Sequence, residues 1–175
     1  MGLYEILKKQ AVELDAGSFA KRYRGHYLLG HFLELDPSLL GFNTGKLPAM
    51  PDLEASGAVA LQPRLWRLEK SDRNTWRSHI SVGRAKNNDV VIRERAISKL
   101  HAHFCVPEAG AHGLQLCDIG SENGTEVNGE RLPQDVPRLV LPGAEIVFAG
   151  TACQLHDESS LLTLLLRQSR RPTRS

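Results

Sequence analysis

From residue 58 onward, the chain consists of short apolar runs separated by turn residues, and this pattern restricts the folds that it can adopt. Apolar and polar residues alternate around Ile80 and Val82 and again around Leu114 and Leu116, which is the period of a strand with one buried face. The pair Asn128-Gly129 suits the positive φ angles of a tight hairpin. We therefore predict a mainly β fold, an antiparallel sandwich or barrel. The predicted strands are 59–70, 76–82, 90–92, 101–106, 113–119, 126–128, 138–141, 145–149 and 151–156.

The residues before this region have a different character. Apolar side chains at helical spacing predict a short amphipathic helix that ends near Ala16-Gly17, with Ser18 as the cap of a second short helix. Residues 26–35 are interpreted as a strand, although their periodicity does not decide between a strand and a buried helix. Residues 36–57 are rich in Pro and Gly, as is typical of a connecting loop.

The chain is predicted to close with a helix. Asp157 is a suitable N-cap for a helix over 158–168, and the basic residues that follow are expected to form a disordered tail. We divide the chain accordingly into three parts. These are a helical N-terminal extension and linker over 1–57, a β-sandwich over 58–157, and a C-terminal helix with a basic tail over 158–175.

Charge and cysteine content narrow the classes of function. The 22 Lys and Arg residues against 20 Asp and Glu give a net charge of +2, too balanced to indicate bulk attraction to nucleic acid or to an anionic membrane. Cys105, Cys117 and Cys153 form no CxxC motif and are predicted to be buried, reduced thiols. No signal-peptide pattern and no apolar run of membrane-spanning length is evident, so we expect a cytoplasmic protein.

Residues suited to binding a phosphate are gathered where predicted strands end, between residues 81 and 129. Arg84 carries a permanently charged, planar fork of donors that matches phosphate oxygens. Ser98 offers a hydroxyl group, Lys99 a second positive charge, and Asn123 both a donor and an acceptor. Binding residues concentrate on loops that a rigid scaffold holds in place. The sequence therefore predicts a local phosphate site on loops.

The order and spacing of these motifs resemble a forkhead-associated (FHA) domain. The resemblance rests on Gly83-Arg84, Asn88-Asp89, Ser98 followed by His101-Ala102, Asp118-x-Gly120-Ser121-x-Asn123-Gly124-Thr125, and Val127-Asn128-Gly129. It extends over roughly residues 58–156. The resemblance implies an eleven-stranded antiparallel β-sandwich that binds phosphothreonine peptides through the loops at one end.

The resemblance also implies roles for single residues. The phosphopeptide-binding residues would be Arg84, Ser98, Lys99, Ser121, Glu122 and Asn123. The residues that support the binding loops would be Gly83, His101, Gly124, Thr125 and Asn128. No catalytic residue, cofactor or metal is implied.

Glu122 departs from the family pattern, which commonly has Thr or a small or basic residue at this position. A carboxylate ~4 Å from a phosphate oxygen is repelled by ~1 to ~4 kcal/mol, depending on the effective dielectric constant. Glu122 therefore turns to solvent, pairs with Lys99 or a cationic residue of the peptide, or weakens phosphate binding, and the sequence leaves these alternatives open.

Two other kinds of site are disfavoured. His101 and His103 alternate along one predicted strand and are conceivable metal ligands, but no Cys or carboxylate stands at matching spacing, so structural histidines are the favoured interpretation. Ser98 and His101 lack a third, orienting group and a G-x-S-x-G motif, which argues against catalysis.

We therefore predict a non-enzymatic, phosphothreonine-binding adaptor in Ser/Thr kinase signalling. Its partner is expected to be a phosphothreonine-containing protein, a Ser/Thr kinase or its substrate, and neither nucleic acid nor a membrane. The alternative is a phosphate-independent interaction or scaffold module on the same fold. Neither hypothesis requires a cofactor, and neither fixes the oligomeric state.

Overall fold

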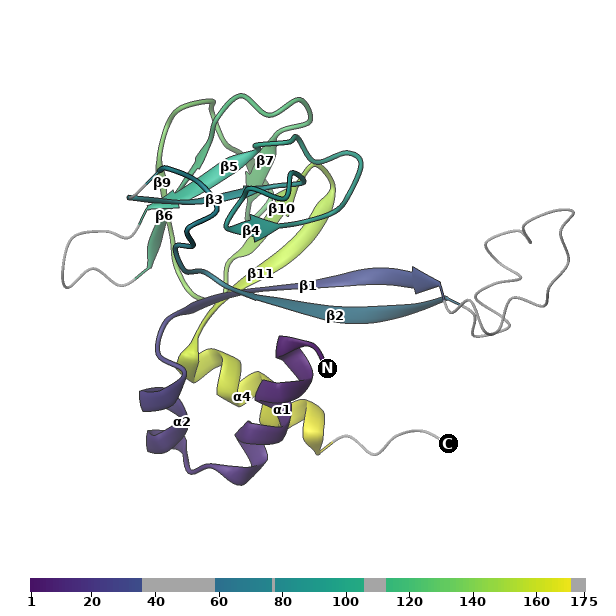
Figure 1. The fold of residues 1–175 in the computed structure, drawn as a ribbon, viewed down its shortest axis with the longest axis vertical. Coiled ribbons are helices and arrows are strands. Elements are labelled where there is room, and N and C mark those ends of the chain that lie inside the picture. The colour runs from purple at the N-terminus through teal and green to yellow at the C-terminus, as the bar shows by residue number, and fades with distance from the viewer. Residues whose placement is uncertain (36–58, 77, 106–112, 171–175) are drawn as a thin grey trace, which may run out of the picture.

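The computed structural model describes residues 1–35, 59–76, 78–105 and 113–170 (Figure 1). Within these ranges the chain forms eleven strands, arranged in two sheets, and three helices. The predicted mainly β fold with a short N-terminal helical segment and a C-terminal helix is confirmed. The predicted linker over 36–57 lies outside the described residues, as does the end of the basic tail.

The two sheets contain six and five strands. The order in the first sheet is β2-β1-β11-β10-β7-β8 and in the second β4-β3-β5-β6-β9. The first consists of β1 (His26–Leu35), β2 (Val59–Arg67), β7 (Thr125–Val127), β8 (Glu130–Arg131), β10 (Glu145–Phe148) and β11 (Thr151–Asp157). The second consists of β3 (His79–Gly83), β4 (Val90–Val91), β5 (Ala102–Cys105), β6 (Leu114–Asp118) and β9 (Arg138–Val140).

The main core lies between the two sheets. Ile80 and Val82 of β3 and Leu116 of β6 are buried in it, as their alternation predicts, and they share it with Phe104 and Phe148. Most of the predicted strands form. The largest differences are in β2, which ends at Arg67 rather than at residue 70, in β3, which begins at His79 rather than at residue 76, and in β8, which the sequence did not indicate.

Residues 27–30 of strand β1 are buried on both faces, which explains the ambiguous pattern of this part of the sequence. Leu28 and Phe32 belong to the core between the sheets, whereas Tyr27 and Leu29 belong to a second core. The strand pairs with β2 on one side and with β11 on the other. The interpretation of residues 26–35 as a strand is confirmed. The six-stranded sheet thus includes β1, which comes from the segment before residue 58. The domain boundary between residues 57 and 58 stays a prediction.

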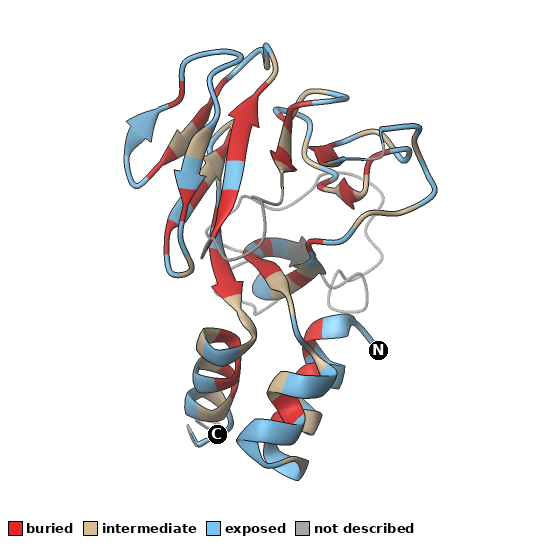
Figure 2. Cartoon of the chain, turned by 90° about the vertical axis from the view of Figure 1, so that its left-hand side faces the viewer, coloured by how far each residue is buried: buried red, intermediate tan, exposed pale blue. Residues whose placement is uncertain are grey.

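The three helices pack together on the outer side of the six-stranded sheet (Figures 1 and 2). They are α1 (Leu3–Glu13), α2 (Ala16–Arg22) and α4 (Glu158–Ser169), and their buried residues face one another and the sheet. None of the helices in the described part of the chain has the length and apolar character of a membrane span. The second core that they form contains Tyr4, Leu7, Ala11, Phe19, Tyr27, Leu29, Leu65, Leu161, Leu162 and Leu165.

Two helix boundaries differ from the prediction, and one agrees with it. The first helix ends at Glu13, and Asp15 rather than Ser18 caps the second, because the Asp15 carboxylate accepts hydrogen bonds from the backbone N–H and the hydroxyl of Ser18. Asp157 caps α4 as predicted. It forms a capping box with Ser160, in which each side chain bonds the other residue's backbone N–H.

The predicted hairpin and the predicted thiols are also present. Asn128 and Gly129 have φ angles of 51° and 80° and join β7 to β8. Cys105, Cys117 and Cys153 are free thiols, but only Cys117 and Cys153 are buried. The prediction of burial is wrong for Cys105. Its side chain lies on the outer face of the five-stranded sheet, because its neighbour Phe104 points into the core between the sheets.

Candidate functional site

The predicted phosphate-binding residues occupy the 84–89 loop after β3, the 92–101 loop after β4 and the 119–124 loop after β6. Main-chain hydrogen bonds join the first two loops, because Arg84 N donates to Ser98 O over 3.0 Å and Ala85 N to Lys99 O over 3.1 Å. The third loop joins them through a side chain, since Glu122 N donates to Ser98 Oγ over 3.1 Å. Ser98 is thus the point at which the three loops meet.

Gly83 and Asn88 hold the first loop against the second. The buried Asn88 amide donates to Ala85 O over 2.9 Å and to Lys99 O over 2.7 Å. A Cβ atom on Gly83 would lie 2.4 Å from Lys99 O, far inside van der Waals contact. Glycine is therefore required at the end of β3 for the two loops to approach each other, as its predicted supporting role demands.

Asp118 organises the third loop from its base. Its carboxylate accepts hydrogen bonds from Gly120 N (3.0 Å), Ser121 N (2.8 Å), Ser121 Oγ (2.7 Å) and Thr125 Oγ1 (2.6 Å). Burial alone would raise the pKa of Asp118, but the hydrogen bonds from Ser121 and Thr125 outweigh burial and lower it below its ordinary value. The carboxylate is therefore ionised at neutral pH and fixes the loop as an acceptor.

His101 braces the second loop against the third. Its fully buried ring accepts a hydrogen bond from Ser98 N at Nδ1 (3.2 Å), so Nε2 carries the hydrogen and donates to Gly124 O (3.1 Å). Burial lowers the pKa of His101 despite the opposing effects of Gly124 O and Asp118. The ring is consequently neutral at pH 7, with both nitrogens in use.

Asp89 is a supporting residue whose contacts the sequence did not reveal. Its side chain is fully buried and accepts hydrogen bonds from Lys70, Ser71, Asn74 and Ser81. Burial would raise the pKa of Asp89, but these hydrogen bonds lower it far below its usual range. The motif Asn88-Asp89 was visible in the sequence, yet nothing in the sequence pairs Asp89 with partners up to 19 residues away.

The side chains at the loop surface retain groups for a ligand. Ser98 Oγ accepts from Glu122 N and has no acceptor for its own hydrogen among the described residues. Asn123 donates from Nδ2 to Ala96 O over 2.8 Å, which orients the amide and leaves its oxygen without a donor in the described part of the chain. The hydroxyl of Ser121, by contrast, is used within its own loop, since it donates to Asp118 and accepts from Gly124 N.

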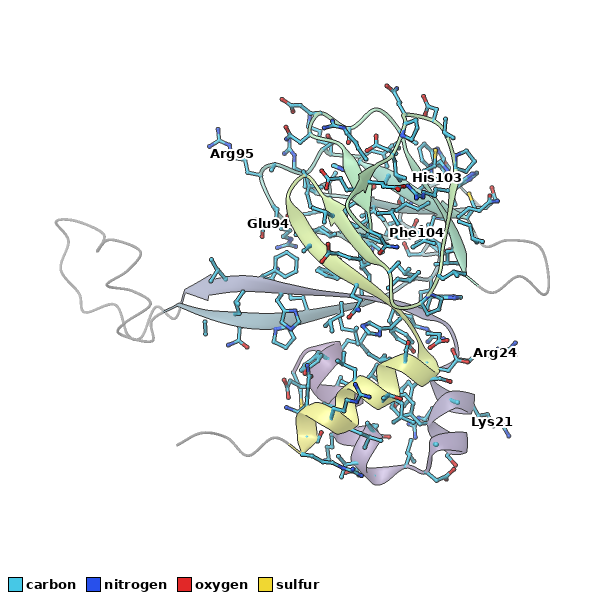
Figure 3. The ribbon with its side chains drawn as sticks, turned by 180° about the vertical axis from the view of Figure 1, so that it is seen from behind. Lys21, Arg24, Glu94, Arg95, His103 and Phe104 are labelled. Atoms are coloured by element: carbon cyan, nitrogen blue, oxygen red, sulfur yellow. The ribbon has the colours of Figure 1, made fainter. Side chains whose placement is uncertain are left out.

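Positive charge predominates on the first two loops. Exposed cations project from them, and Arg95 extends outward from the sandwich (Figure 3). No ion pair occupies these cations within the described ranges. Glu122 is exposed and likewise has no ion-pair partner there. The cations are Arg84, Lys86, Arg93, Arg95 and Lys99.

The structure brings Arg84, Ser98, Lys99, Glu122 and Asn123 together, with Ser121, Gly124 and Thr125 behind them. Asn128 lies apart from this group. Its side-chain oxygen accepts from Glu145 N over 2.9 Å, so it fixes the hairpin against β10, and within the described ranges it has no hydrogen bond to the three loops.

Comparison with known proteins agrees with this arrangement. Residues 80–149 match the model of the FHA domain family. The chain is 36% identical over 88 residues to the ABC transporter ATP-binding/permease protein Rv1747 of Mycobacterium tuberculosis. This match covers 48% of the chain and 10% of that protein, so the chain spans only a small part of the length of its curated relative.

Solved structures similar to the chain include two FHA domains. One is the FHA domain of CT664 from Chlamydia trachomatis, with 18% identity, a TM-score of 0.46, and coverage of 76% of this chain and 98% of that one. The other is the N-terminal FHA domain of Rad53 from S. cerevisiae in complex with a phosphothreonine peptide, with 18% identity, a TM-score of 0.46, and coverage of 79% and 98%. The match to the family model, over the residues that form the three loops and their supporting strands, identifies residues 80–149 of the chain as an FHA domain.

Proposed function

We propose that this chain binds phosphothreonine peptides through Arg84, Ser98, Lys99 and Asn123. The observation that carries the proposal is the junction at Ser98, where three loops converge and present a free hydroxyl hydrogen beside an exposed arginine. FHA domains are in general phosphopeptide-binding modules, and the similar Rad53 domain was solved with a phosphothreonine peptide.

Each side chain has a distinct role in this proposal. The Arg84 guanidinium donates two parallel hydrogen bonds to phosphate oxygens, and the Ser98 hydroxyl donates a third. Lys99 adds a positive charge beside them. The Asn123 oxygen accepts from a peptide N–H next to the phosphothreonine, because its Nδ2 is held by Ala96 O. The network behind the loops fixes this geometry before the ligand arrives, which lowers the entropic cost of binding.

The same contacts favour a non-catalytic role. His101 is the nearest base to Ser98 in sequence, but its two ring nitrogens accept from Ser98 N and donate to Gly124 O. The imidazole thus has no free nitrogen to remove a proton from the Ser98 hydroxyl. We propose binding without chemistry, as in FHA domains generally.

Within a cell, such a module would act as an adaptor in Ser/Thr kinase signalling. Its partner would be a phosphothreonine-containing protein, either a kinase or a kinase substrate. The second candidate is a phosphate-independent interaction module, which the exposed and unpaired Glu122 favours because its carboxylate repels a phosphate placed near Ser98.

Arg84→Ala tests the proposal. We expect affinity for a library-selected phosphothreonine peptide to fall by about 3 kcal/mol or more, since two charge-assisted hydrogen bonds of about 1.5 to 3 kcal/mol each are lost. Lys86→Ala is the matched control, because Lys86 is an exposed cation on the same loop outside the proposed contact set. Titration calorimetry measures both variants with the phosphorylated and the unphosphorylated peptide.

The melting temperature of Arg84→Ala should equal that of the unchanged protein, because Arg84 is exposed. Equal affinity of the unchanged protein for the two peptides would contradict the proposal and support the phosphate-independent module instead.

A further inference from the structure

A second cluster of ligating side chains lies on the outer face of the five-stranded sheet. The antiparallel pairing of β3 with β5 places His79 directly opposite Cys105. His103 lies two residues before Cys105 and therefore on the same face. His103 and its neighbour Phe104 project from β5 to opposite faces, with Phe104 in the core (Figure 3). One ligand atom from each of His79, His103 and Cys105 lies within 4.8 Å of the other two.

This spacing is close to that of a tetrahedral metal site. With Zn–N bonds of about 2.0 Å and Zn–S bonds of about 2.3 Å, neighbouring ligand atoms of such a site are about 3.3 to 3.7 Å apart. The two imidazole rings already lie edge to face, with centroids 4.4 Å apart and planes at 87°. Since the ligand atoms lie within 4.8 Å of one another, they must approach by about 1.5 Å or less to reach the separations of such a site.

Each of the three side chains has an atom available to bind a metal. His103 Nδ1 is buried and has no hydrogen-bond partner in the described part of the chain. His79 Nδ1 is bonded to Ser78 Oγ over 2.9 Å, which orients the ring and leaves its other nitrogen for an ion, as an outer partner does in metal sites. Cys105 is a free, half-buried thiol, which would lose its proton on binding a metal.

The surroundings leave room for a fourth ligand. A surface pocket of about 360 Å³ opens beside the two histidines and is walled by Trp76 and Ile119. The Trp76 ring lies 6.3 Å from both imidazole centroids. Water or a small ligand can thus complete the coordination, and a tryptophan stands next to the ion.

We propose that His79, His103 and Cys105 bind one Zn²⁺ ion per chain, with the fourth position open to the pocket. A His₂Cys set of borderline and soft donors suits this ion. The three ligands lie outside the phosphopeptide loops, although Ile119, the first residue of the 119–124 loop, walls the pocket beside them. His79 begins β3, whereas Gly83 and Arg84 lie at its other end. The ion would join β3 to β5 across the outer face of the sheet.

Titration with Co²⁺, followed by its displacement with Zn²⁺, tests the proposal under reducing conditions without a competing thiol. We expect one Co²⁺ per chain, visible bands of tetrahedral Co²⁺, a near-ultraviolet thiolate-to-metal band and quenching of Trp76 fluorescence. Cys105→Ala should abolish the thiolate band and weaken Zn²⁺ binding at least about 100-fold, since even groups behind the ligands cost about 10- to 100-fold when removed.

Matched controls separate the cluster from other histidines and thiols. Cys117 is the cross-strand partner of His103 but lies outside the cluster, and His31 is exposed on β1. Cys117→Ala and His31→Ala should both keep the bands and the affinity. Zn²⁺ should raise the melting temperature of these two variants and leave that of Cys105→Ala unchanged.

Two results would overturn the assignment. One is the absence of a thiolate-to-metal band in the unchanged protein. The other is a band that Cys117→Ala removes and Cys105→Ala retains. Phosphopeptide affinity, measured with and without Zn²⁺, should be the same, so loss of metal binding and loss of phosphopeptide binding are independent results.

Discussion

Glu122 places an exposed carboxylate beside two loops on which cations predominate, and its backbone N–H is bonded to Ser98 Oγ. If its side chain faces the phosphate, Glu122→Thr removes the repulsion and supplies a hydroxyl donor. We then expect phosphopeptide binding to tighten by about 1 kcal/mol or more at low salt. The gain should shrink at high ionic strength, where exposed charges are screened. Titrations at two salt concentrations measure both effects.

Glu94→Gln is the control for this change, because Glu94 carries the same charge on the neighbouring 92–101 loop. It should alter affinity less than Glu122→Thr does. Unchanged or weaker binding by Glu122→Thr would show that the Glu122 carboxylate faces solvent or a basic residue of the peptide.

His101 is expected to act on the ligand only through the loops. His101→Ala leaves Ser98 N and Gly124 O without their partner, which should lower the free energy of unfolding by about 1 to 3 kcal/mol. Phosphopeptide affinity should fall with it, because the loops lose their brace. Urea denaturation and calorimetry measure the two quantities, with His31→Ala as the exposed control. Lost affinity at unchanged stability would instead place His101 in contact with the peptide.

For single residues, the sequence predicted which loops carry the site residues better than it predicted the hydrogen bonds that these residues make. The motif around Arg84, Ser98 and Asn123 located the loops because its spacing follows the strands that carry them. The engagement of the Ser121 hydroxyl by Asp118 and Gly124 could not be predicted, since it depends on how one loop folds upon itself.

Among the elements, α4 depends on its cap. Asp157→Ala removes the acceptor for Ser160 N at the first turn and should lower the free energy of unfolding by about 1 kcal/mol. Asp157→Asn keeps a capping oxygen and should cost less. Thermal or urea unfolding of the two variants provides the measurement. An equal loss in both would mean that the charge of Asp157, rather than its hydrogen bond, is the stabilising feature.

The elements differ in how well the sequence reveals them. Strands such as β3 and β6, whose aliphatic side chains alternate along the sequence and face the core between the sheets, show a period of two and were predicted. Strand β1 shows no clear period because its residues 27–30 are buried on both faces, and β8 has only two residues. The meeting of His79 with Cys105 was missed for another reason. It follows from the register between two strands, which neither strand encodes alone.

For the molecule as a whole, the environment of His156 leads us to expect that the free energy of unfolding falls at acid pH. The ring is buried, and neither of its nitrogens has a hydrogen-bond partner in the described part of the chain. Burial lowers the pKa of His156 despite the opposing charge of Asp157. Between this lowered pKa and the unfolded value of about 6.5, only the unfolded state holds the proton, so stability falls as the pH drops below about 6.5.

His156→Leu should therefore raise the free energy of unfolding at pH 7.5 by about 1 kcal/mol or more, because an unpaired buried polar group is removed. It should also reduce the loss of stability between pH 6.5 and the lowered pKa by up to about 1.4 kcal/mol per pH unit. Urea denaturation over a series of pH values tests this. A residual slope is expected from His26, His101 and His103, whose pKa values are also lowered by burial. A slope identical to that of the unchanged protein would exclude His156 as the cause.

Strand β1 contributes side chains to both cores, Leu28 and Phe32 to the core between the sheets and Tyr27 and Leu29 to the core beneath the helices. Separation of the helices from the sandwich would expose Tyr27 and Leu29. Removal of β1 from the sheet would open the core around Leu28 and Phe32. Local opening at either layer is thus tied to global unfolding. Slow amide hydrogen exchange should extend without a break from the sandwich into α4, as in a single cooperative unit.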